Sequence, residues 1–298
     1  MATFSRLLAL MAGSTLLTAA FAQNAPVQAP SGPARTVTLN ESDSAYLVNA
    51  LKAEPVVMTP RLESLIRRIR GDFANPNANF GVTTGYGLGS GQAFVGVSAL
   101  FDADRRGRVN GTDGVDGSIS GGFGLGDPVS SVGLEIDTSI MSTNPNDGTF
   151  GESGEVGVKL HKVFPHLNNL GIALGWADAG KWGAARNNKD TIYAAASVDL
   201  PVHLINGYPL QFTLGGGTGS FRGSNTVANK VKAFGSLGTQ LTERTAISTS
   251  WSGNALNVGL GWVPCDAPVS IMLGVTDVTD RTKEGLAYNL SVGYSFNY

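Results

Sequence analysis

The chain ends in Leu290-Ser291-Val292-Gly293-Tyr294-Ser295-Phe296-Asn297-Tyr298, where apolar residues alternate with small or polar ones up to the last position. A period of two predicts a β-strand with two unlike faces. A soluble protein rarely ends on such a strand without a cover, because a bare apolar edge invites aggregation. Either lipid covers this face, or the strand lies at the edge of a soluble β-sandwich.

This ending resembles the closing strand of bacterial outer-membrane β-barrels, in which a C-terminal aromatic residue and alternating apolar residues are read by the insertion machinery. The resemblance implies that Tyr294, Phe296 and Tyr298 form an insertion signal, and that outer-membrane lipid and the barrel insertion machinery are partners. Those barrels most often end in Phe, whereas this chain ends in Tyr298. The resemblance covers residues 79–298 as a pattern, is motif-like only in the last strand, and identifies no subfamily.

The other end of the chain carries export features. Residues 1–22 contain Arg6, an apolar run from Leu7 to Ala20 and the triplet Ala20-Phe21-Ala22. This order predicts a cleaved secretory signal peptide. Its apolar run is shorter than the about 20 residues that a membrane-spanning helix needs. Residues 23–35, rich in Pro, Ala and Gln, predict a flexible linker.

Composition narrows the class of protein further. No later apolar run approaches the length of a membrane helix, so a membrane location requires a closed barrel. Charged residues make up 15% of the chain, against about 25% in typical soluble domains. The net charge of −2 gives no basic signature for nucleic acid. A single Cys, Cys265, excludes an internal disulfide and lies in a Pro-flanked turn.

Residues 36–78 differ in pattern from residues 79–298 and predict a short N-terminal helical extension. Thr59 can cap a helix in which Leu62, Leu65, Ile66 and Ile69 form one apolar stripe. Three placements are open: a plug inside the barrel, a periplasmic helix that docks on a cell-envelope protein or membrane surface, or a cap on the barrel rim.

From residue 79 onward the chain is a succession of segments with period-two alternation separated by turn residues, which is the pattern of a transmembrane β-barrel. The thirteen segments run over 79–88, 92–101, 117–126, 129–140, 154–163, 168–178, 190–200, 207–217, 229–239, 244–252, 255–263, 268–277 and 286–298.

Single-chain bacterial barrels have even strand numbers. If the C-terminus is periplasmic, the longer gaps fall on the outer side and the shorter gaps on the inner side when 92–101 is the first of about twelve strands. Residues 79–88 are then a lead-in strand, or they pair with a partner in 36–57 to make about fourteen. The sequence therefore predicts an all-β, antiparallel transmembrane barrel over 79–298.

The positions that alternate with the apolar ones face the lumen in such a barrel. They include charged candidates for the lining of a channel: Glu135, Asp137, Glu155, Lys159, Asp199, Lys230 and Lys232. Charges of both signs among small residues can line a water-filled path and set its ion selectivity. Alternatively they pair and close the interior, because unpaired buried charges are costly. The many small inward residues favour the open path.

No catalytic constellation accompanies the three histidines, His161, His166 and His203, and no cluster has metal-ligand spacing. We therefore expect neither an enzyme nor a bound metal or cofactor. The first expectation is an outer-membrane channel for passive diffusion of small hydrophilic solutes or ions. The alternative is a structural barrel that anchors a surface layer or partner protein through outer loops or residues 36–78. Whether the barrel forms a homo-oligomer stays open.

Overall fold

The structure is a computed structural model that describes residues 39, 41–53, 56–59, 61–63, 65–66, 76–102, 115–140, 150–187, 190–205, 207–222, 231–264, 268–282 and 285–298. The expected signal peptide (1–22) and linker (23–35) lie outside these residues, as does Cys265. No helix in the described ranges is long and apolar enough to cross a membrane.

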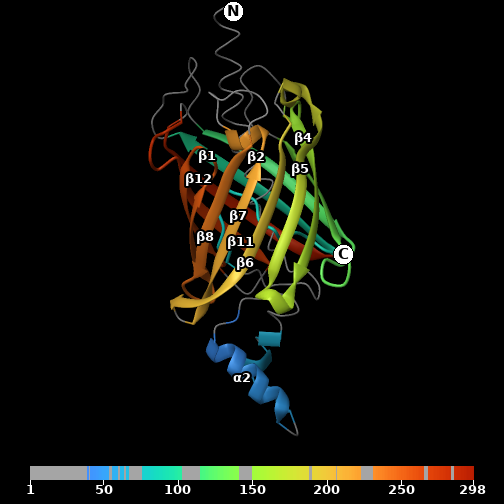
Figure 1. Cartoon of the computed structure of the whole chain (residues 1–298), viewed down its shortest axis with the longest axis vertical. Helices are drawn as coiled ribbons and strands as arrows, with labels where there is room; N and C mark the ends of the chain where they lie inside the picture. Colours follow the sequence, from blue (N-terminus) through green and yellow to red (C-terminus); the bar gives the residue numbers. More distant parts are fainter. Residues whose placement is uncertain are drawn as a thin grey trace, which may run out of the picture.

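Twelve antiparallel strands form a closed barrel in which each strand pairs with its sequence neighbours and β1 closes the ring on β12 (Figure 1). The strands are β1 (Gln92–Asp102), β2 (Val115–Leu125), β3 (Gly133–Ile140), β4 (Gly154–Phe164), β5 (Leu170–Trp182), β6 (Ile192–Ile205), β7 (Tyr208–Gly217), β8 (Lys232–Gln240), β9 (Thr245–Trp251), β10 (Leu256–Trp262), β11 (Val269–Thr276) and β12 (Ala287–Asn297). The predicted antiparallel barrel of twelve strands is confirmed, and the alternative of fourteen is wrong because β1 and β12 pair along their full length.

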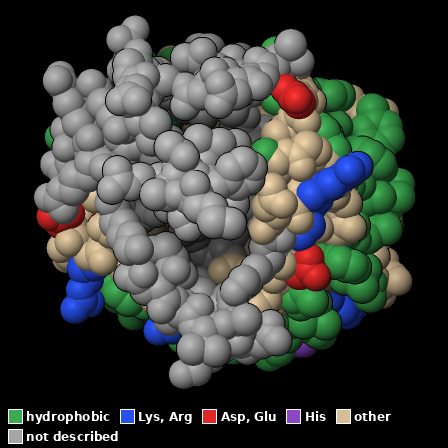
Figure 2. Space-filling model, turned by 90° about the horizontal axis from the view of Figure 1, so that it is seen from above, with side chains coloured by type: hydrophobic (Ala, Val, Ile, Leu, Met, Phe, Trp, Pro, Cys, Tyr) green, Lys and Arg blue, Asp and Glu red, His purple; other side chains and the backbone are tan. Residues whose placement is uncertain are grey.

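Side chains alternate along the strands as the sequence predicts. In β12, Asn289 and Ser291 are buried, while Tyr288, Leu290 and Tyr294 are exposed. Exposed apolar side chains cover the outside of the wall; for example, Leu174 is 61% exposed and Val97 is 52% exposed. Seen along the barrel, such side chains form the flank of the molecule (Figure 2). A closed wall that satisfies its own backbone and is apolar outside is the surface of a transmembrane β-barrel.

The two ends of the barrel differ in their connections. At one end, here called the turn end, β1 begins, β12 ends and short connections join β2 to β3, β4 to β5, β6 to β7, β8 to β9 and β10 to β11. At the other end, the loop end, the connections are longer except for the hairpin between β9 and β10. This asymmetry agrees with the predicted order of long and short gaps.

The helical extension begins with α2 (Glu41–Lys52), which lies below the turn end and outside the lumen (Figure 1). The backbone N–H of Glu41 donates to the carbonyl oxygen of Gly207, in the connection between β6 and β7, at 3.2 Å. Thr59 caps a second helical stretch, as predicted: its hydroxyl oxygen accepts from the N–H of Leu62 at 3.2 Å. Arg61 joins this stretch to α2 through an ion pair with Asp43 at 2.7 Å.

Residues 76–91, here called the lumen segment, form no strand of the wall but run inside the barrel (Figure 1). The segment enters beside β8 and β10, where the Cβ positions of Gly238 and Gly261 face Ala78 and Asn77. It rises to Ser250 and Asn257, close to the loop end, and returns along β6, β5, β4 and β3 to Gly126. Residues 79–88, expected as a strand, belong to this segment, because the closure of β1 on β12 leaves them no edge to pair with.

Candidate functional site

The barrel interior is the candidate site, and it contains a buried ion pair. On β3 and β4, Oε1 of Glu135 lies 3.1 Å from Nζ of Lys159, and both side chains are almost completely buried. Oε2 of Glu135 accepts from the N–H of Leu88 at 2.8 Å, and Nζ of Lys159 donates to the carbonyl oxygen of Tyr86 at 3.3 Å. Nε2 of His161 donates to the carbonyl oxygen of Leu88 at 2.9 Å. We call Glu135, Lys159 and His161 the anchor cluster, because all three bind the backbone of the lumen segment.

Further wall residues hold the same segment along β5 and β6. The hydroxyl of Ser197 accepts from the N–H of Gly85 at 2.9 Å and lies 2.8 Å from the hydroxyl of Thr213. The hydroxyl of Tyr86 donates to the carbonyl oxygen of Asn169 at 2.7 Å. Buried backbone polar groups need such partners, because without them each would lose its hydrogen bonds to water. The wall therefore supplies the pairing that a neighbouring strand would otherwise provide.

Glycines of the wall provide the space for the segment. A Cβ at Gly274 would lie 2.1 Å from Cζ of Phe80, and one at Gly259 would lie 2.4 Å from Cβ of Phe80. Gly85 and Gly171 approach so closely that a Cβ on Gly85 would lie 2.1 Å from the carbonyl oxygen of Gly171. Only residues without a side chain permit these contacts. These inward glycines thus lie where the lumen segment touches the wall.

An aromatic cluster fills the interior toward the loop end. Phe221 stacks on Phe234 with ring centroids 4.3 Å apart, and Tyr193 meets Phe221 edge to face at 6.2 Å. Val82, at the top of the lumen segment, belongs to the same buried cluster. The apolar turn of the segment therefore packs on β6 and β8 and the short 3₁₀-helix η3 (Gly219–Arg222).

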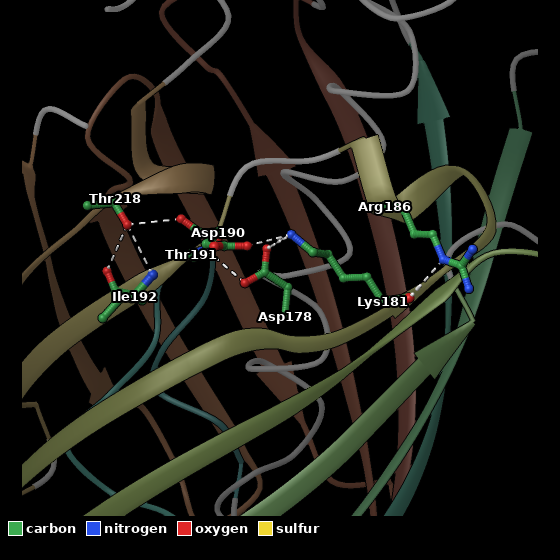
Figure 3. Close-up of polar contacts among 7 residues, drawn as sticks. All are labelled: Asp178, Lys181, Arg186, Asp190, Thr191, Ile192 and Thr218. Carbon is green, nitrogen blue, oxygen red and sulfur yellow. Dashed lines mark hydrogen bonds and ion pairs between the residues drawn. The ribbon is translucent and has the colours of Figure 1, made fainter. Parts of the chain in front are cut away.

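A group of carboxylates occupies the loop half of the interior on β3, β4 and β5, and we call Asp137, Glu155 and Asp178 the acidic wall. The Asp178 carboxylate accepts a hydrogen bond from the N–H of Thr191 at 2.8 Å and forms an ion pair with Lys181 at 3.4 Å (Figure 3). Lys181 also binds Asp190 at 2.7 Å (Figure 3). No described residue forms a salt bridge with Asp137 or Glu155, and Oε1 of Glu155 accepts no hydrogen bond from the part of the chain that the structure describes.

The structure places the predicted lining residues in two settings. Glu135 and Lys159 belong to the anchor cluster, and Asp137 and Glu155 to the acidic wall. Asp199 is buried and accepts from the side-chain amide of Asn169 at 3.0 Å. Lys232 begins β8, nearly opposite β3 in the ring of strands, and Lys230 lies outside the described residues.

Sequence reasoning missed the lumen segment, the aromatic cluster and Asp178. The signal for the segment was available in two parts: Phe80, Val82, Tyr86 and Leu88 alternate without a hairpin partner, and glycines recur at inward positions of β5, β10 and β11. Within the described ranges, no three His, Cys, Asp or Glu side chains are placed to hold a metal ion.

Fold and interior together define a transmembrane β-barrel with a polar, partly occupied lumen. The sequence matches no family model and no curated protein. Among solved structures it is similar to a KdgM porin, with 14% identity and a TM-score of 0.45 over 68% of this chain and 99% of that one. It is also similar to an outer membrane channel from Pseudomonas putida F1 (12% identity, TM-score 0.41, 70% of this chain and 97% of that one). A third similar structure is the Acinetobacter baumannii outer membrane protein Omp33 (9% identity, TM-score 0.38, 70% and 98%).

Proposed function

We propose that the protein is a porin-like channel of the bacterial outer membrane, through which small hydrophilic solutes or ions diffuse passively. The turn end, with α2, faces the periplasm, and the loop end faces the exterior. The lumen segment narrows the path inside the barrel.

The observation that carries this proposal is the acidic wall. A barrel that served only as an anchor could fill its interior with matched groups, because unpaired buried charges are strongly unfavourable. Asp137 and Glu155 instead present carboxylates inside the barrel without a salt-bridge partner in the described ranges. Such carboxylates need water or an ion to compensate their charge, and the lining of a channel can supply both.

The test is conductance in planar lipid bilayers. One variant replaces residues 79–88 with Gly and Ser, which removes Phe80, Val82, Tyr86 and Leu88 but keeps the length of the chain. We expect small, discrete current steps from the native protein and several-fold larger steps from this variant.

The matched control lacks residues 41–66, which include α2 outside the lumen, and its steps should equal those of the native protein. Absence of current from folded native protein and from the 79–88 variant alike would overturn the proposal. That result would favour the structural role, in which the barrel anchors a partner.

A further inference from the structure

The charges on β3, β4 and β5 do not balance inside the barrel. These strands bring four carboxylates into the interior, those of Glu135, Asp137, Glu155 and Asp178, but only two ammonium groups, those of Lys159 and Lys181. Each ammonium group already has its own carboxylate: Lys159 pairs with Glu135, and Lys181 with Asp178. The formal surplus of negative charge therefore rests on Asp137 and Glu155.

These two carboxylates lie close together. Asp137 is paired in register with Gly157, and a Cβ on Gly157 would lie 2.7 Å from each carboxylate oxygen of Asp137. Because Gly157 and Glu155 are two residues apart on β4, they share its inward face. The Asp137 carboxylate therefore lies against the inward face of β4, next to Glu155.

Buried oxygen atoms without hydrogen-bond partners indicate a ligand beside Asp137 and Glu155. Glu155 is only 3% exposed, yet its Oε1 has no hydrogen-bond partner in the described ranges. Its register partner Ser139 is 1% exposed, and its hydroxyl is likewise without a partner there. Buried polar atoms without partners are rare in folded proteins and call for a missing ligand, water or ion.

Among charged ligands, only a cation suits these groups. Carboxylate and hydroxyl oxygens are the ligands of hard cations, whereas an anion would meet two like charges. The described residues offer no set of three metal-ligating side chains at coordination distance. A site with so few direct ligands suits a hydrated monovalent ion that enters and leaves, as conduction requires.

The lumen segment binds β3 and β4 nearer the turn end than this site. Glu135, Lys159 and His161 of the anchor cluster bind its backbone there. Its apolar turn at Val82 packs on Tyr193, Phe221 and Phe234 instead.

We propose that Asp137, Glu155 and Ser139 form a binding site for hydrated monovalent cations, which makes the path selective for cations over anions. The selectivity rests on the proposed channel function, whereas binding at the site does not.

Two measurements test the site. The first is the reversal potential in bilayers under a KCl gradient. Native protein should prefer K⁺ over Cl⁻ several-fold, and D137N/E155Q should bring the permeability ratio close to one. The matched control E41Q/D127N removes the same formal charge from α2 and from the connection between β2 and β3, and should keep the native ratio.

The second measurement needs no conduction. Exchange of Na⁺ with the site should broaden the sodium NMR line of detergent-solubilised native protein and of E41Q/D127N, but not of D137N/E155Q. Heat-modifiable gel migration confirms folding of each variant, and E155Q alone serves if the double variant does not fold.

Loss of broadening in D137N/E155Q without any conductance in native protein would support the site and overturn the channel. An unchanged permeability ratio and an unchanged linewidth in the folded variant would overturn the site.

Discussion

Nζ of Lys159 lies 3.1 Å from Oε1 of Glu135, and the other oxygen of the same carboxylate accepts the backbone N–H of Leu88. One buried ion pair thus joins two neighbouring strands of the wall to the segment inside the barrel. A buried pair need not stabilise a fold relative to well-packed apolar residues, but breaking it leaves an unpaired buried charge. Its value here is in fixing where residues 86–88 lie, because both charges also bind that backbone.

Replacing Lys159 with Met should therefore be severe. The Glu135 carboxylate would lose its counter-ion, which should lower the unfolding free energy by about 3–5 kcal/mol. The lumen segment would lose the hydrogen bond from Lys159 to the carbonyl oxygen of Tyr86. Urea unfolding in detergent measures the first effect, and protease cleavage within residues 76–91 measures the second.

The control for this change is Lys162→Met. The ammonium group of Lys162 binds the carbonyl oxygens of Val129 and Ser131 in the connection between β2 and β3, and not those of the lumen segment. Its variant should resist cleavage like native protein, and E135Q/K159M should recover part of the lost stability. Equal cleavage in K159M and native protein would contradict the anchoring role.

The contact of Phe80 with Gly274 predicts a coupled pair. Gly274→Ala places a Cβ where the Phe80 ring lies, and overpacking of this kind costs about 1–3 kcal/mol. Phe80→Ala leaves a cavity that costs about 3–5 kcal/mol. In the double variant the new methyl group enters the space of the ring, so the two effects should fall short of additivity by about 0.5–3 kcal/mol.

Unfolding free energies of the four proteins in this cycle check the coupling. Gly180→Ala is the matched control, because its Cβ would meet only Val156, at the ordinary distance of 3.5 Å. That change should be nearly neutral and additive with Phe80→Ala. Full additivity of Gly274→Ala with Phe80→Ala would mean that the ring does not occupy this position.

The wall could be predicted from the sequence because period-two alternation indicates a β-strand and also which of its side chains face the lumen. Glu135 and Asp137 were expected inside for that reason, and both side chains are buried there. The same pattern fails for Phe80 and Leu88, because alternation does not reveal whether a partner strand exists. Small inward residues suggest an open path, yet Gly259 and Gly274 receive Phe80. A contact between residues so distant along the chain leaves no local pattern.

Asp127, in the connection between β2 and β3, predicts a dependence on pH. The hydroxyl of Ser130 and the N–H of Val129 donate to its carboxylate and lower the pKa of Asp127 below its ordinary value. A lowered pKa in the folded state favours folding above the unfolded-state pKa, and this contribution is lost as pH falls through the folded-state pKa. The thermal unfolding midpoint of native protein should therefore fall in acid more than that of Asp127→Asn.

Ser130→Ala removes the largest cause of the lowered pKa and should reduce the acid dependence only in part, because the Val129 N–H remains. Asp127 is only partly buried, so the effect should be small. Identical acid profiles for native protein and Asp127→Asn would show that the carboxylate has no part in the stability of this turn.

The end of the chain gives the last prediction. Tyr294 and Phe296 lie on the outer face of β12 with ring centroids 6.0 Å apart. Tyr298 lies beyond the strand, where its N–H donates to the carbonyl oxygen of Gly91 and its hydroxyl to that of Gly124, each at 2.9 Å.

If these aromatic residues form the insertion signal, F296S/Y298S should lower the amount of heat-modifiable protein in the outer-membrane fraction several-fold. Tyr288→Ser removes an equally lipid-facing ring from the loop end of β12, so it separates loss of a signal from loss of apolar area. Tyr298→Phe keeps the ring and loses only the bond to Gly124, so its membrane level should stay near native while its unfolding free energy falls by about 1 kcal/mol. Equal losses in F296S/Y298S and Tyr288→Ser would assign the effect to apolar area and remove the case for a signal at this end.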